Sequence, residues 1–146
     1  MTARLVHRLL LSLAAKPPIG IGFLGTSHSH GEGKVETILA NPAYQLIGAT
    51  EPTPKHKDLP ILSRAALLSH PGIQVIAVES AVRDHARDGL AVLEAGKHLH
   101  LEKPPTNKME PFRELAALAQ SRTRLLQLGY LWRFHEGVNR VREAVK

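Results

Sequence analysis

Cysteine is absent from this chain of 146 residues. Its absence excludes disulfides, thiolate zinc sites and thiol nucleophiles. The lack of cysteine also agrees with a reducing compartment, and we expect the chain to be cytoplasmic. Any redox chemistry would have to come from a bound cofactor.

Aromatic side chains and long apolar runs are also scarce. Aromatic residues make up 4% of the chain, and no apolar run approaches the roughly 20 residues that cross a bilayer. The net charge of +6 favours an anionic ligand, with phosphate the simplest candidate. The basic C-terminal part has no module of stacking aromatics and is interrupted by Glu136 and Glu143. We therefore predict neither a membrane partner nor a nucleic-acid partner.

The first 18 residues differ in pattern from the rest. Arg4 and Arg8 precede the apolar residues 9–15, as in a weak export or organelle leader. The alternative is an amphipathic extension that Pro17 and Pro18 terminate. We expect residues 1–18 to lie outside the folded domain.

From residue 19 onward, short apolar runs alternate with helical stretches. This pattern is typical of βαβ units and predicts an α/β fold, a Rossmann-type doubly wound and mainly parallel sheet in a single domain over residues 19–146. Glycine at position 96 predicts a left-handed helix end, and Asn107 with Glu110 predicts an N-cap. The strands are expected at residues 19–24, 44–50, 73–78, 99–101 and 125–130. The helices are expected at residues 34–40, 63–69, 84–95, 107–121 and 138–146.

The loop at residues 25–31 joins the first strand to the first helix. A dinucleotide fold turns sharply there, so that the helix start points to a pyrophosphate. Of the three usual glycines only Gly25 is present, because Ser27 and His30 stand at the other two positions. A plain tight turn without a ligand is the alternative.

Glu51 follows the second strand, where a carboxylate binds the adenosine ribose hydroxyls of a dinucleotide. A carboxylate there accepts both hydroxyls of NAD and repels the 2′-phosphate of NADP, so NAD is the predicted cofactor and NADP the alternative. Lys55, His56 and Lys57 follow closely and offer a second way to hold a phosphate. Glu51 is otherwise a solvated residue at a strand end.

Lys103 lies at the carboxyl end of an apolar strand, within the segment 96–105, and such strand ends bind ligands in open α/β sheets. A lysine paired with Glu102, or simply exposed, is the alternative. The chain resembles the glucose-fructose oxidoreductase, inositol dehydrogenase and MocA-like (Gfo/Idh/MocA) family. The resemblance covers residues 19–146 and rests on the segments 21–25, 51–52, 84–85, 96–104 and 129–134.

The resemblance implies a Rossmann domain that binds NAD or NADP. Where family members often have Thr-Pro-Asn, this chain has Ser80-Ala81-Val82, and only the later His85 keeps its place. By this resemblance Lys103 is the catalytic candidate at the nicotinamide. The implied cofactor-binding residues are Gly25, Thr26, Ser27, His28, Glu51, Ser80, His85, Glu102 and Lys103.

The resemblance also implies a second α/β domain with the site for a sugar or polyol. The chain ends at Lys146, before that domain would begin, so we expect no turnover from it alone. The surface that packs on such a domain would be apolar and favour a homo-oligomer. A non-catalytic nucleotide-binding or dimerisation module is the rival reading.

Two histidine pairs have the spacing of metal ligands. His28 with His30, and His98 with His100, are each separated by one residue, which on a strand places both side chains on one face. No further ligand follows at a regular spacing. The sequence therefore predicts no metal site.

Overall fold

The computed structural model describes residues 16–146. The predicted leader lies outside this range over residues 1–15. Five parallel strands form one sheet in the order β2-β1-β3-β4-β5. The order in which strands are added therefore reverses at β1, because β2 lies on one side of it and β3 on the other. The strands are β1 (Ile19–Leu24), β2 (Tyr44–Ala49), β3 (Val75–Val78), β4 (His98–Leu101) and β5 (Leu126–Leu128).

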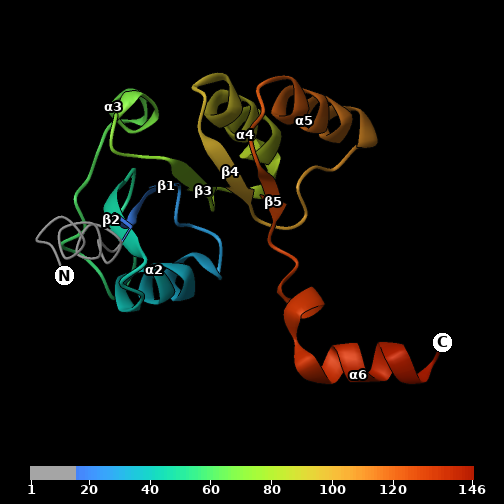
Figure 1. Cartoon of the computed structure of the whole chain (residues 1–146). Helices are drawn as coiled ribbons and strands as arrows, with labels where there is room; N and C mark the ends of the chain where they lie inside the picture. The colour runs from blue at the N-terminus through green and yellow to red at the C-terminus, as the bar shows by residue number, and fades with distance from the viewer. Residues whose placement is uncertain (1–15) are drawn as a thin grey trace, which may run out of the picture.

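Helices cover both faces of the sheet, which confirms the predicted doubly wound architecture. α2 lies on one face, and α4 and α5 pack together on the other, with α3 on their side (Figure 1). The helices are α2 (Gly31–Ala40), α3 (Arg64–Ser69), α4 (His85–Glu94), α5 (Met109–Ser121) and α6 (Glu136–Ala144), with short 3-10 turns η1 (Val82–Asp84) and η2 (Leu131–Phe134).

Alternating side chains on the strands build a core on each face. Leu99 and Leu101 of β4 pack with Leu115 of α5 in one core. Ile21 and Phe23 of β1 pack in the other core with the helix α2. The histidines that alternate with the leucines of β4 therefore point toward the α2 side of the sheet, on one face as predicted.

Two local predictions at helix ends had different outcomes. Gly96 has φ of +72°, which confirms the left-handed helix end after α4. The predicted N-cap at Asn107 is wrong, because α5 begins at Met109 after an extended Lys108 with no capping side chain. The Thr106 hydroxyl donates a hydrogen bond to the Lys108 carbonyl and so holds the turn beyond Asn107.

The C-terminal segment stands away from the sheet. η2 and α6 extend from the end of β5 into open space (Figure 1). Trp132 and Phe134 are 61% and 73% exposed, and Val138, Val141 and Val145 of the following segment are also exposed. Across residues 16–146, the helices are too short or too polar to cross a bilayer.

Candidate functional site

A cavity of about 390 Å³ opens at the carboxyl ends of β1, β2 and β3. It lies beside the point where the strand order reverses, which is where open α/β sheets bind ligands. Four of the predicted site residues meet in its wall. These are Gly25, Ser27, Glu51 and Ser80.

Gly25 brings the backbone close to the loop that follows β3. Its φ of +76° is in the left-handed region, and a Cβ at this position would come within 2.7 Å of the Ser80 Cα. The Gly25 amide donates a hydrogen bond of 2.8 Å to the Thr50 hydroxyl at the end of β2. A larger residue would therefore disturb the floor of the cavity. The predicted need for glycine at position 25 has a local structural cause.

Charged side chains of both signs surround the cavity. The exposed Glu51 carboxylate lies at one rim, and the guanidinium groups of Arg64, Arg83 and Arg87 contribute to the wall. Arg64 Nη1 lies 2.6 Å from the buried Asp88 carboxylate. Burial acts to raise the pKa of Asp88, but hydrogen bonds from Arg64, Ser80 and Arg87 outweigh burial and lower it. Asp84 also lines the wall and pairs with Arg83 and Arg87, so the three arginines are matched by Asp84, Asp88 and the exposed Glu51.

Two other predicted residues are held inside the protein. The Thr26 hydroxyl donates a hydrogen bond of 2.8 Å to the Pro52 carbonyl. His85 is fully buried, and its ring nitrogens lie 2.8 Å from the Pro104 carbonyl oxygen and 2.9 Å from that of Ser80. His85 thus connects the loop after β3 with the loop after β4, and it does not line the cavity.

A second group of polar residues lies around the carboxyl ends of β3 and β4. Glu79 and Glu102 follow the paired residues Val78 and Leu101, and both carboxylates are fully buried. Lys34 of α2 reaches in between them. Its ammonium donates a hydrogen bond of 2.5 Å to Glu79 and another to Glu102 Oε2. One lysine therefore pairs with two buried carboxylates.

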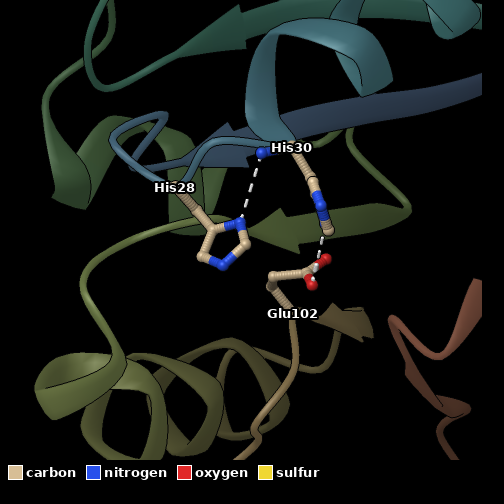
Figure 2. Close-up of side chains that lie close together, drawn as sticks. All are labelled: His28, His30 and Glu102. Carbon is tan, nitrogen blue, oxygen red and sulfur yellow. Dashed lines mark hydrogen bonds and ion pairs between the residues drawn. The ribbon is translucent and has the colours of Figure 1, made fainter.

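Two histidines from the loop before α2 lie on the other side of Glu102. Figure 2 shows His28 and His30 converging with the Glu102 carboxylate. His30 Nδ1 lies 3.2 Å from Glu102 Oε1, and His28 Nδ1 accepts a hydrogen bond from the His30 amide. The His28 amide in turn donates a 2.9 Å hydrogen bond to the Glu79 carbonyl. These contacts fix the loop to the ends of β3 and β4.

The pKa values in this group reflect burial and the shared lysine. Burial raises the pKa of Glu79 against the opposing effect of Lys34. Burial acts in the same direction on Glu102, but there the Lys34 hydrogen bond and charge prevail and lower the pKa. Burial also lowers the pKa of His28. Lys34 therefore outweighs burial at Glu102 and only partly offsets it at Glu79.

Lys103 extends from the same strand end toward solvent. Its side chain is 39% exposed, and its Nζ lies 3.9 Å from Glu102 Oε1. This weak contact leaves the ammonium able to meet a ligand. The structure thus separates the predicted residues into the cavity wall, two buried anchors and the group around Glu102 to which His28 and Lys103 belong.

Lys34 and Glu79 belong to the site, although the sequence pattern predicted neither of them there. Glu79 occupies the same place after β3 as Glu102 does after β4, so the shared strand-end position was the signal available for it. Lys34 carries no such signal. The sequence pattern predicts that the helix begins at Lys34, whereas α2 begins at Gly31 and the lysine lies one turn inside.

The comparison with sequence profiles identifies one family. Residues 19–130 match the sequence profile GFO_IDH_MocA, described as an oxidoreductase family with an NAD-binding Rossmann fold. The uncharacterized oxidoreductase YdgJ of Escherichia coli (strain K12) is 29% identical over 116 residues, which are 75% of this chain and 34% of that protein. The chain therefore spans about a third of the length of this curated relative.

Known crystal structures share the fold. A 3-ketoreductase from Actinomadura kijaniata, in complex with TDP-benzene and NADP, has a TM-score of 0.78 and 22% identity over 88% of this chain and 43% of its own. A biliverdin reductase from Synechocystis sp. PCC 6803, in complex with biliverdin and NADP+, has a TM-score of 0.69 and 23% identity over 78% of this chain and 38% of its own. The chain belongs to the Gfo/Idh/MocA family of oxidoreductases, and its fold is an NAD-binding Rossmann domain.

Proposed function

We propose that this chain binds NAD in the cavity beside Gly25 and forms the cofactor half of an oxidoreductase that acts on an alcohol of the sugar or polyol type. The observation that carries the proposal is the close approach at Gly25, where even a Cβ would meet Ser80 at 2.7 Å. Phosphate groups need such a close backbone approach, because they accept hydrogen bonds from backbone amides.

The cavity has the size and the polar groups that a dinucleotide needs. The opening of about 390 Å³ is of the size that holds part of a cofactor. In the proposed arrangement Gly25, Thr26, Ser27 and His28 form the pyrophosphate loop, with Thr26 acting through the backbone that its hydroxyl anchors. Glu51 accepts the ribose hydroxyls. Ser80 lines the opposite wall.

The nicotinamide end is assigned to Glu102 and Lys103. When bound, the dinucleotide supplies the hydride acceptor for oxidation of an alcohol carbon. The hydroxyl proton of such a substrate needs a group within hydrogen-bond reach. Lys103 is the proposed group for this proton, which its Nζ would accept in the neutral amine form. Its side chain extends past the strand end and is only weakly paired. Glu102 and His85 act as positioning residues, Glu102 beside the lysine and His85 through the two loops it joins.

The proposed domain division is a cofactor domain over residues 19–146 and a substrate site on a second domain. The main support is that the chain matches only 34% of the length of YdgJ. Lys103 is then one part of a proton path whose other part lies outside these residues. We expect the pure chain of 146 residues to give no NAD reduction with sugars or polyols, as followed by absorbance. Robust turnover would contradict the proposed division.

A second candidate function is an association module with a nucleotide-binding core. The exposed Trp132 and Phe134 on a segment that stands away from the sheet favour it. In this role the Rossmann core binds the dinucleotide and the C-terminal segment binds a second copy. The two functions share the cofactor site and differ in whether hydride transfer follows once a substrate domain is supplied.

Calorimetric titration with NAD and NADP tests the cofactor assignment. We expect the unmodified chain to bind NAD more tightly than NADP, because Glu51 repels a 2′-phosphate. Glu51→Gln removes that repulsion, so the preference should shift toward NADP by roughly tenfold, or about 1.4 kcal/mol. Glu94→Gln, at an exposed position on α4, is the matched control. Equal selectivity in both variants and the parent chain would exclude Glu51 from the ribose site.

A further inference from the structure

We propose that His28, His30 and Glu102 form a binding site for a divalent metal ion of the Zn²⁺ class. One ligand atom from each residue lies within 4.8 Å of the others. Two imidazole nitrogens and a carboxylate oxygen are a ligand set that Zn²⁺ takes in proteins. The sequence predicts no metal site, because no third ligand follows the histidines at a regular spacing. The structure supplies one in Glu102, which lies 72 residues beyond His30 in the chain.

The loop before α2 holds both imidazoles in place for an ion. His28 Nδ1 accepts a hydrogen bond from the His30 amide, which leaves His28 Nε2 as its ligand atom. The two rings meet edge to face, with their centroids 4.9 Å apart. His30 Nδ1 already points at Glu102 Oε1 at 3.2 Å (Figure 2). An ion between them needs a modest opening of this one contact.

Two clusters of possible metal ligands share Glu102, and Lys34 occupies one of them. Glu79, His100 and Glu102 also lie within ligand distance of one another. The Lys34 ammonium, however, bonds both carboxylates of that second cluster and so already provides its cation. Glu102 Oε2 is thereby occupied, and Oε1 is the oxygen that remains for an ion on the histidine side. A hydrogen bond to the other oxygen of a ligating carboxylate also fixes its orientation.

The neighbouring charges predict a moderate affinity and an open ligand position. Three protein ligands leave a fourth tetrahedral position for water or an anion. Lys103 Nζ lies 3.9 Å from the ligating oxygen and opposes a second cation, as does the positive end of the helix α2. Removal of the Lys103 charge should therefore strengthen metal binding.

This site goes beyond the proposed function and does not require it. His28 belongs to the loop assigned to the pyrophosphate, so an ion here would lie next to that group. The test uses the metal alone, without dinucleotide. Failure to bind metal would leave the cofactor proposal intact, and failure to bind NAD would leave the metal proposal intact.

The experiment is a titration of the full chain with Co²⁺, followed by its visible absorption, and then displacement by Zn²⁺. We expect one saturable site per chain. His28→Gln and His30→Gln should each weaken the Co²⁺ affinity by at least about tenfold. Mutation of residues that only hydrogen-bond to metal ligands already lowers metal affinity or activity by about 10- to 100-fold. His70→Gln, whose ring bonds Gly72 outside the site, is the matched control and should bind as the parent chain does.

A further variant keeps the test decisive if the histidine variants unfold. Lys103→Gln retains all three ligands, and we expect it to bind Co²⁺ several-fold more tightly than the parent chain. Thermal unfolding of each variant without metal identifies any that have lost the fold. Absence of saturable binding by the parent chain would overturn the proposal. Folded His28→Gln and His30→Gln variants with the parent affinity would overturn it as well.

Discussion

Lys34 shows how a single side chain can determine the state of two buried acids. Its ammonium bonds Glu79 and Glu102, each of which is fully buried. Removal of one member of a buried charged group leaves the other charges without a partner. The loss of stability is then larger than the net stability that the intact group contributes. The lysine is therefore a structural requirement of the site as well as a neighbour of the proposed ligands.

Lys34→Met should lower the free energy of unfolding by about 3 kcal/mol at pH 7, at the lower end of the range for buried pairs because the lysine side chain is 25% exposed. Urea denaturation measures this change. The double variant Lys34→Met with Glu79→Gln removes one of the orphaned charges and should recover part of the loss. A single variant as stable as the parent chain would contradict the described pairing.

Asp88 gives the fold a defined dependence on acid. Its pKa is lowered in the folded chain, so its stabilising effect is present above its unfolded pKa and is lost as the pH falls through the folded pKa. Asp88→Asn should cost about 2 kcal/mol at pH 7, since it removes hydrogen bonds between charged groups. The difference between parent and variant should shrink below about pH 4, as measured by urea midpoints across pH. A difference that stays constant down to pH 2 would contradict this account.

At the scale of elements, strands were easier to predict than helix starts. The strand at 19–24 is predictable because its apolar residues are bounded by proline and glycine, and β1 has these bounds. The end of α4 is predictable because Gly96 alone can take the left-handed conformation without strain. The start of α5 is not predictable in this way. The sequence has an N-cap pattern at Asn107, but in the fold the Thr106 hydroxyl bonds the Lys108 carbonyl, and that contact depends on how the loop folds.

The segment of η2 and α6 exposes several apolar side chains. Trp132 and Phe134 are 61% and 73% exposed. We expect the chain to associate as its concentration rises, because contiguous exposed apolar surface favours contact. The double variant Trp132→Ser with Phe134→Ser should shift it toward the monomer in sedimentation equilibrium.

Arg133→Ser, between the two aromatic residues, is the matched control for that variant and should associate as the parent chain does. A parent chain that stays monomeric over the whole concentration range would show that this segment needs no second copy.

At the scale of the whole molecule, the sequence predicts the sheet and the cofactor class but not the full site. Gly25 and Glu51 could be found because their place after a strand has a known chemical meaning, and both line the cavity. Lys34 and Glu79 could not be linked to Glu102, because their contacts arise only when α2 folds over the ends of β3 and β4. Long-range pairs of this kind leave no periodic trace in the chain.

The most direct test of the account is an amide NMR titration of the isotope-labelled chain with NAD. We expect saturable shifts concentrated at Gly25, Ser27, Glu51 and Ser80, which line the cavity at the carboxyl ends of β1, β2 and β3. The amides of Leu126–Leu128 in β5, on the far edge of the sheet, should change little. Shifts concentrated on β5, or none at millimolar NAD, would contradict the central claim.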